Sequence, residues 1–402
     1  MEGRSIVITG TGAVTPLGTG TKAYWEGLVS GLCGIGEIRS FDASDLPIRR
    51  AGEVRDFDPR DFMPKPLALD TAPFARYAIA AAAMAVEESG LNTDSQRVGI
   101  VMGTALHGME YLLRARQLQE ETGRGDDPKL MTKYMGNMAA AQFAIRRGIR
   151  GPSLTVGTAC SSGGDAVALG AMLLRSGMAD AAVVMAGEGA ICPTVIRSLH
   201  KTRALSPLGE SRPFSADRSG FVLGEGGGAL VLETEAHAEK RNARPLARLL
   251  GWGNNTDAYH PVTPRPDGTQ AAACMRLALE EAGLSPSDIG YINAHGTATP
   301  KGDAAEAAAI HAVFGDKIPP VSSTKGATGH LMGAGGITEL IACVKALETG
   351  LLPPNLGFTA ADEECPLPLV TETGREAGIR AAMSNAFGFG GQNSSLIVGL
   401  AG

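Results

Sequence analysis

The feature that most constrains the fold is an alternation of short apolar runs with longer, alanine-rich segments. Runs such as 5–9, 97–102 and 153–156 are rich in β-branched and other apolar residues, which is typical of strands in a buried parallel sheet. Further runs of this kind are 180–186, 228–232, 289–293, 320–322, 379–384 and 394–399. Segments with helical spacing lie between them at 73–89, 160–175, 268–282 and 334–348. This alternation predicts an α/β architecture.

The chain also repeats itself coarsely, because each half contains a strand, a polar turn and a helix of small residues. We expect the boundary near 245–255, which gives an N-terminal half of residues 1–250 and a C-terminal half of residues 251–402. Neither half ends in a low-complexity linker. The sequence therefore predicts two halves that pack closely together, with 402 residues to build the core.

Composition excludes several classes of function. The 36 basic and 42 acidic residues give a net charge of −6, without the basic stripe of a nucleic-acid-binding protein. The six cysteines form no CxxC pair and no histidines stand at metal-ligand spacing, so we expect no metal site and a reducing compartment. The start lacks the apolar segment of a signal peptide, and the apolar runs are too short to cross a bilayer. We expect a soluble, cytoplasmic protein without membrane contact.

The stretch "GTGAVT" at 10–15 follows the first predicted strand and begins like a dinucleotide-binding loop. Thr15 stands where the third glycine of that fingerprint belongs, and no acidic residue closes the unit convincingly. We therefore interpret 10–15 as a tight turn.

One cysteine stands where a predicted strand turns into a predicted helix, in "GTACSSGG" at 157–164. The thiol of Cys160 would lie at the helix N-terminus, where unpaired N–H groups and the helix dipole favour a thiolate. The glycines at 157, 163 and 164 permit the sharp turn of a nucleophile elbow. The alternative is a buried structural cysteine, which is common for this residue type.

Two histidines of the second half stand in similar surroundings. His295 follows a predicted strand and precedes Gly296, and His330 shares a glycine-rich turn with Lys325. A lone histidine is more often structural or solvated, but a cysteine with two such histidines supplies the parts for acyl transfer through a thioester. The segment 385–395, "NAFGFGGQNSS", is either a structural hairpin turn or a mobile loop that offers N–H groups to an oxyanion.

These motifs together resemble the β-ketoacyl-ACP synthases, the condensing enzymes of the thiolase superfamily, from about residue 4 to residue 400. The sequence is most similar to the fatty-acid synthase II type and to the ketosynthases of type II polyketide systems. The matching motifs are "GTACSSG", "RPFSADRSGFVLGEGGGALVLE", "DAYHPVTPRPDG", "NAHGTATPKGD", "SSTKGATGHLMGAGG" and "NAFGFGGQN". The resemblance implies a thiolase-like, five-layered α-β-α-β-α fold built from two duplicated halves.

The resemblance also implies a reaction, the decarboxylative Claisen condensation of an acyl group with malonyl-ACP to give β-ketoacyl-ACP. Cys160 would carry the acyl group, and His295 and His330 would bind the malonyl thioester carbonyl. No cofactor is implied, because the substrates are carried on the phosphopantetheine of an acyl carrier protein. The other implied roles are Lys325, Asp303 and Glu339 in the supporting polar network, Cys160 and Phe389 in the oxyanion hole, Phe389 with Phe387 at the gate, and Thr297 and Thr299 on the pantetheine arm.

The match is weaker where the carrier and the acyl chain would bind. In the fatty-acid enzymes the segment matching 61–70 is basic, whereas here it keeps only Lys65. Leu106 stands where a residue that blocks the acyl tunnel is usual, and His107 replaces an expected glycine, either in the pocket or at a surface or interface. Other basic residues that could face an acidic carrier are Arg76, Lys129, Lys133, Lys201 and Arg203. Fatty-acid elongation and specialised polyketide or polyene elongation therefore both stay open.

Two relatives of the family are weighed against this interpretation. A thiolase needs a second cysteine near the C-terminus, but the last one, Cys365, lies outside the "AFGFGG" loop. A chain-length factor, the non-catalytic partner of polyketide ketosynthases, lacks the nucleophile that Cys160 supplies. We keep the non-catalytic partner as the alternative function. A homodimer is expected, and a heterodimer with a chain-length factor stays possible.

Overall fold

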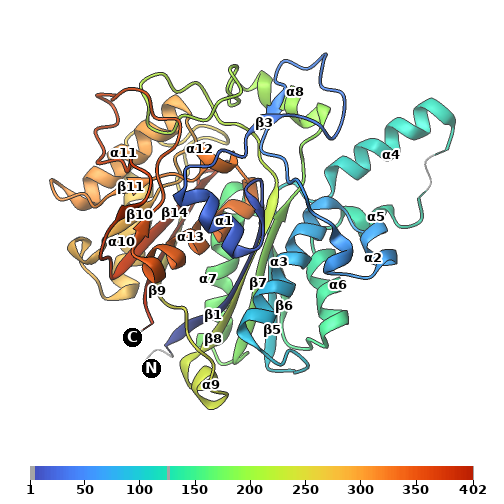
Figure 1. Cartoon of the computed structure of the whole chain (residues 1–402), viewed down its shortest axis with the longest axis horizontal. Helices are drawn as coiled ribbons and strands as arrows, with labels where there is room; N and C mark the ends of the chain where they lie inside the picture. The colour runs from blue at the N-terminus through green and yellow to red at the C-terminus, as the bar shows by residue number, and fades with distance from the viewer. Residues whose placement is uncertain (1–4, 125–126, 402) are drawn as a thin grey trace.

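The computed structural model describes residues 5–124 and 127–401, and its main sheet has eleven strands (Figure 1). The strands of the first half are β1 (Ile6–Thr15), β5 (Val98–Gly103), β6 (Ser153–Val156), β7 (Ala181–Glu188) and β8 (Gly226–Thr234). Those of the second half are β9 (Ala247–Thr256), β10 (Tyr291–Asn293), β11 (Val321–Ser322), β14 (Ala381–Gly388) and β15 (Gln392–Leu400). The short strand β2 (Gly18–Thr19) pairs with β1.

The strand order is the same in both halves. The first half reads β6-β5-β7-β8-β1 and the second reads β11-β10-β14-β15-β9, so each runs third, second, fourth, fifth, first. In each half the second strand is parallel to the third and fourth, and the fifth is antiparallel. The halves join where Ile6–Ile8 of β1 pairs with Ala247–Leu249 of β9. The division at residues 250 and 251 falls inside β9 and stays a prediction.

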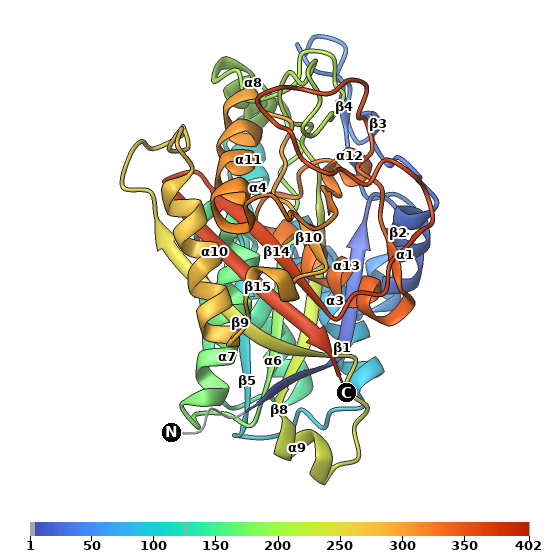
Figure 2. The ribbon, with the colours of Figure 1, turned by 90° about the vertical axis from the view of Figure 1, so that its left-hand side faces the viewer.

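The helices that pack on this sheet give the fold its layers. Helices α7 (Ser162–Arg175) and α13 (Gly335–Thr349) each follow the third strand of their half and pack against one another between the two halves of the sheet. Helices α3 (Pro73–Ser89) and α6 (Met138–Arg147) cover the outer face of the first half. On the opposite side, α10 (Thr269–Ala282) and α11 (Pro300–Phe314) cover the second half (Figure 2). The predicted five-layered α/β fold is thus confirmed.

The remaining elements surround these layers. They are α1 (Thr21–Val29), α2 (Lys65–Leu69), α4 (Met109–Thr122), α5 (Leu130–Tyr134), α8 (Pro193–Lys201), α9 (Glu235–Lys240), α12 (Lys325–Thr328), β3 (Gly36–Glu37), β4 (Arg50–Ala51), β12 (Leu351–Leu352), β13 (Arg375–Glu376), and the 3₁₀ turns 59–61, 159–161, 286–288 and 332–334. In Figure 1, α4 extends away from the layered body. No helix in 5–124 or 127–401 combines the length and hydrophobicity needed to cross a bilayer.

Two predicted loops are strands in the structure. The tight turn expected at 10–15 is wrong, because β1 continues to Thr15. A Cβ atom on Gly10 or Gly12 would lie 2.1 or 2.0 Å from a backbone oxygen of α3, so these glycines let the helix approach the strand. In the C-terminal segment, β14 extends to Gly388 and β15 begins at Gln392. The hairpin turn therefore consists only of residues 389–391.

Candidate active site

The nucleophile candidate sits in a tight elbow between β6 and α7. Cys160 lies in a 3₁₀ turn, and the preceding Ala159 has a φ of +51°, which is rare for a residue with a side chain. Ser162 braces the elbow, since its hydroxyl accepts the N–H of Thr158 at 2.9 Å and donates to the Ala159 carbonyl at 2.6 Å. The turn therefore holds the buried thiol at the start of α7, as the sequence predicts.

One imidazole from the second half contacts this thiol from the first, and a second imidazole lies beside it. His330 Nε2 lies 3.0 Å from Cys160 Sγ. The ring of His295 stands nearly perpendicular to that of His330, with ring centroids 5.4 Å apart. The backbone of His330 is fixed by its N–H, which donates to the Val222 carbonyl at 2.7 Å, and by its carbonyl, which accepts the N–H of Gly224 at 2.9 Å.

A buried ion pair lies behind the imidazoles. The ammonium of Lys325 contacts the carboxylate of Glu339, and both side chains are almost fully buried. Lys325 begins α12 and Glu339 lies in the second turn of α13, so the pair joins the two helices that flank His330. Such a pair is costly to desolvate, and each partner depends on the other.

The environment keeps the reacting groups neutral. Burial, together with the positive charge of Lys325, lowers the pKa of His295 and of His330 well below its usual value. Burial raises the pKa of the Cys160 thiol to about 11, while Lys325 and the N–H of Phe389 act in the opposite direction. The expectation that the helix N-terminus lowers this pKa is therefore wrong for the free protein, because desolvation outweighs it.

A buried carboxylate that the sequence analysis missed holds the His295 turn. Glu306, on α11, accepts the N–H groups of His295 at 2.8 Å and of Gly296 at 2.7 Å. Asp303, one turn earlier on α11, accepts the N–H groups of Phe214 at 2.7 Å and Ala298 at 3.1 Å. Burial raises the pKa of each carboxyl to about 7. Two acidic residues in an otherwise alanine-rich helix were the signal that could have indicated Glu306.

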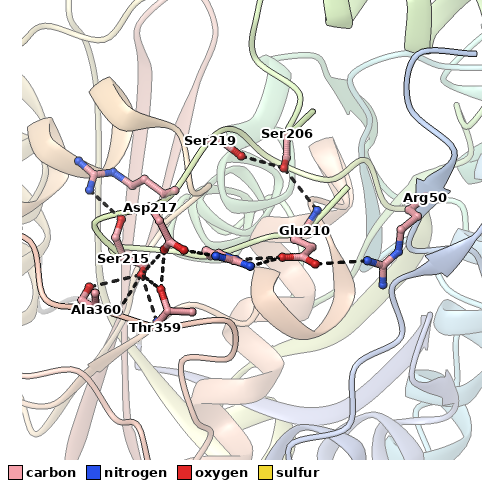
Figure 3. Close-up of polar contacts among 10 residues, drawn as sticks. Arg50, Ser206, Glu210, Ser215, Asp217, Ser219, Thr359 and Ala360 are labelled. Carbon is pink, nitrogen blue, oxygen red and sulfur yellow. Dashed lines mark hydrogen bonds and ion pairs between the residues drawn. The ribbon is translucent and has the colours of Figure 1, made fainter. Parts of the chain in front are cut away.

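The segment 206–219 near the site is tied down by polar contacts. Figure 3 shows Ser215 beside Asp217 and Thr359, and its hydroxyl lies 2.7 Å from Asp217 Oδ1 and 2.9 Å from Thr359 Oγ1. In the same view, Arg50 reaches Glu210, with 3.8 Å between the ion-paired atoms. These contacts fix the segment that supplies the Phe214 N–H to Asp303.

A cavity of about 670 Å³ opens onto the reacting groups. Cys160, His295 and His330 line it together with Thr297 and Thr299, whose hydroxyls lie 3.0 Å apart. Both gate candidates also line it, and the ring of Phe387 lies 6.0 Å from that of His295. A Cβ atom on Gly388 would lie 2.8 Å from the Thr158 carbonyl oxygen and 3.2 Å from the Cys160 nitrogen, so the hairpin packs directly on the elbow.

Three of the six basic candidates separate into two groups. Arg203 lines the cavity, as do Arg265 and Lys301, which the sequence analysis did not single out. Lys129 and Lys133 are instead ion-paired with Asp70 and Asp127, near α5. Positive charge at the cavity therefore comes from Arg203, Arg265 and Lys301 rather than from the segment 61–70.

Leu106 and His107 lie on another side of the elbow and do not line the described cavity. Leu106 packs in the apolar cluster that contains Cys160 and Met332. The ring of His107 has its centroid 6.2 Å from that of Tyr134, and a Cβ atom on Gly136 would lie 3.0 Å from its Nδ1. Leu106 thus belongs to the apolar cluster of the nucleophile, whereas His107 packs toward α5, and a role in the acyl pocket stays a prediction for both. Among residues 5–124 and 127–401, no His, Cys, Asp and Glu side chains gather in a group that could hold a metal.

Comparison with known families identifies the family of this chain. The sequence matches "Beta-ketoacyl synthase, N-terminal domain" over residues 3–238 and "Beta-ketoacyl synthase, C-terminal domain" over residues 246–359. The chain belongs to the beta-ketoacyl synthase family. Its relatives in this family include the 3-oxoacyl-[acyl-carrier-protein] synthase 2 of Coxiella burnetii and that of Vibrio cholerae. Each is 38% identical to this chain, and the alignment covers 99% of both proteins.

Solved structures of ketosynthases superimpose on this chain over its whole length. "The ishigamide ketosynthase/chain length factor" superimposes with a TM-score of 0.94 and 34% identity over the whole of both chains. A type II polyketide acyl carrier protein in complex with its ketosynthase bound to the hexaketide gives a TM-score of 0.90 and 27% identity, again over the whole of both chains. The ketosynthase fold therefore extends along the full sequence.

Proposed function

We propose that this beta-ketoacyl synthase joins an acyl group held on Cys160 to the two-carbon unit of a malonyl thioester, with release of carbon dioxide. The observation that carries the proposal is the contact of 3.0 Å between Cys160 Sγ and His330 Nε2, with His295 beside it at the end of one cavity. The substrates are thioesters of an acyl carrier protein, and the reaction needs neither a metal nor a redox cofactor.

In the first step the acyl group moves onto the chain. Sγ of Cys160 attacks the thioester carbonyl while His330 Nε2, which is neutral, accepts the thiol proton. The N–H groups of Cys160 and Phe389 stabilise the oxyanion. The tetrahedral intermediate then releases the carrier thiolate, which takes the proton from His330, so the imidazole is neutral again.

In the second step malonyl thioester enters the same cavity. For this step His330 takes the tautomer with its proton on Nε2, and an imidazole N–H from each of His295 and His330 donates to the thioester carbonyl. The malonyl carboxylate then leaves as carbon dioxide. The resulting enolate is stabilised by these donors and by the charge of Lys325, and it attacks the acyl carbonyl on Cys160. The sulfur leaves as a thiolate and takes up one proton, which restores the free protein.

Other residues hold the substrate. We assign the phosphopantetheine arm to Thr297 and Thr299, the gate to Phe387 and Phe389, and attraction of the acidic carrier to the cavity's basic side chains. Asp303 and Glu339 support the polar network. The six free cysteines fit the reducing conditions of the cytoplasm, where we place the enzyme. We expect a homodimer, and a heterodimer with a chain-length factor is the other possible assembly.

The pathway is chain elongation, of a fatty acid or of a type II polyketide or polyene. Synthases of the first kind and ketosynthases of the second both match this chain over its full length. The non-catalytic chain-length partner is not favoured, because the nucleophile and both histidines stand together.

The test is intact-mass spectrometry after incubation with a panel of acyl-carrier thioesters. We expect an acyl adduct on the native protein, and none on Cys160→Ala. Addition of malonyl-carrier should then remove the adduct and give a β-ketoacyl product. A native protein that forms no adduct, alone or with a partner subunit, would overturn the proposal.

A further inference from the structure

Outside the groups that react, one buried carboxylate links two turns beside the nucleophile. Glu188 is the last residue of β7 and is fully buried. Its Oε1 accepts the hydroxyl of Thr104 at 2.7 Å and the N–H groups of Ala105 and Leu106 at 3.2 Å. Its Oε2 accepts Leu106 N–H at 3.2 Å and, from the other half of the fold, Gly333 N–H at 3.4 Å. Every one of these donors is uncharged.

The two turns that share this acceptor are closely packed. A Cβ atom on Gly333 would lie 2.7 Å from the Ala105 nitrogen. Leu106 and Met332 pack in one apolar cluster with Cys160. Without an anion between them, the N–H groups of the two turns would face one another unpaired. The carboxylate therefore sets how closely Leu106 approaches Met332 next to the sulfur.

We propose that Glu188 is a positioning residue that determines which acyl chains Cys160 accepts, because it holds the Leu106 turn against the Met332 turn. This inference rests on the proposed function, because it needs an acyl chain on Cys160, and on the prediction that Leu106 borders that chain. Glu188 itself touches no reacting atom, and it acts through the position of Leu106.

Glu188→Gln is the direct test. The amide keeps one oxygen but places an NH₂ group among donors, so the turns move apart and longer chains gain room. We expect the ratio of Cys160 acylation rates, long-chain to short-chain acyl-carrier, to rise about tenfold, the usual effect of losing a hydrogen bond to a charged group. Short-chain loading should change by less than about twofold. Glu225→Gln is the control, since the pKa of the half-buried Glu225 is likewise raised to about 7 by burial, but its carboxylate accepts the N–H of Val54.

A double-mutant cycle separates positioning from general damage. Leu106→Ala should raise the same ratio, and Glu188→Gln in that background should add little, because both changes act through one side chain. Equal slowing of every chain length, an unchanged ratio in Glu188→Gln, or additive effects of the two changes would each overturn the proposal.

The native protein provides a test that needs no change at Glu188. Burial raises the pKa of Glu188 to about 7, so the carboxyl is mostly protonated at pH 6 and ionised at pH 8. The titratable groups that face it are the Cys160 thiol and Glu110, whose pKa values are raised to about 11 and about 8. We expect a higher long-to-short ratio at pH 6 than at pH 8, in the native protein and in Glu110→Gln alike. A ratio independent of pH would contradict the proposal.

The two proposals can fail separately. If the native protein forms no acyl adduct, the proposed function fails, and amide hydrogen exchange still tests Glu188. Faster exchange at Leu106 and Gly333 in Glu188→Gln, but not in Glu225→Gln, would support the positioning role. Unchanged exchange at both amides would overturn it.

Discussion

The two halves of this protein share one strand order but present different chemistry at corresponding strand ends. After the third strand, the first half places Cys160 and the second places Lys325 and His330. After the second strand, the first half makes the Leu106 turn and the second makes the His295 turn. The same frame thus supplies the nucleophile and its apolar surroundings from one side, and the imidazoles and the ion pair from the other.

Each half also fixes the turn after its second strand with a buried carboxylate. Glu306 binds the His295 turn within its own half, whereas Glu188 binds the Leu106 turn and reaches Gly333 in the other half. The positive charge of Lys325 acts on Glu306, while uncharged donors surround Glu188. The comparison shows that a buried carboxylate that accepts backbone N–H groups can fix one turn, as Glu306 does, or connect turns of two halves, as Glu188 does.

The largest expected effect separates the chemical roles of the halves. Cys160→Ala should abolish acyl loading, since it removes the nucleophile. His295→Ala should still load the acyl group but condense it about 10²–10³ times more slowly, the usual loss for one donor to a developing oxyanion. Loading is measured by intact mass and condensation by release of carbon dioxide. Condensation by His295→Ala at the native rate would contradict the assignment of acyl loading to Cys160 and of condensation to His295.

Breaking the buried ion pair of the second half should lower the free energy of unfolding. Lys325→Met leaves the Glu339 carboxylate buried without its partner, and we expect a loss of about 3–5 kcal/mol in the free energy of unfolding. The double variant Lys325→Met with Glu339→Gln should recover most of it. Denaturant unfolding measures both. A double variant as unstable as the single one would show that the pair does not act as a unit.

Glu306 predicts a pH dependence of stability. Its pKa is raised from 4.5 to about 7, so between these values the folded protein keeps a proton that the unfolded chain has released. Stability from this group is therefore lost as pH rises from about 4.5 to about 7, by about 3 kcal/mol. Glu306→Gln should lower the difference in unfolding free energy between pH 5 and pH 8 by that order. If the variant showed the same difference in unfolding free energy between pH 5 and pH 8, Glu306 would not be the group that causes this pH dependence.

A substitution between the central helices should disturb both halves together. A Cβ atom on Gly336 of α13 would lie 2.4 Å from the Gly164 nitrogen of α7. We expect Gly336→Ala to destabilise the fold by about 1–3 kcal/mol through overpacking. Gly378→Ala is the control, because a Cβ atom on Gly378 would have no other atom within 4 Å. Thermal unfolding should show one shifted transition for Gly336→Ala, and two separate transitions would mean that the halves unfold independently.

The smallest effect concerns a surface contact between the halves. Arg175 on α7 lies 4.2 Å from the ring centroid of Trp252 on β9 and pairs with Glu281 on α10. Because the arginine is partly exposed, we expect Arg175→Ala to cost about 1 kcal/mol in denaturant unfolding. A loss of unfolding free energy as large as that of Lys325→Met would show that this surface contact stabilises the fold as much as the buried ion pair does.

Sequence patterns predicted four of the main helices but not the tertiary contacts between them. Alternating apolar and alanine-rich segments predicted α3, α7, α10 and α13 to within about two residues, because periodicity is a local property. The strand β9 was not among the predicted strands, because the segment 245–255 was interpreted as the boundary between the two halves. The roles of Cys160, His295 and His330 stay predictions until the proteins are assayed.

By itself, the sequence determined the α/β class, the elbow at Cys160 and the two histidine turns, because short-range glycine and β-branched patterns fix local backbone geometry. Only the tertiary structure decided that Cys160 Sγ meets His330 Nε2, that Glu188 and Glu306 hold turns of other segments, and that burial raises the pKa of the thiol. Those properties depend on burial and on donors from other segments, and desolvation is a property of the packed fold rather than of any local stretch.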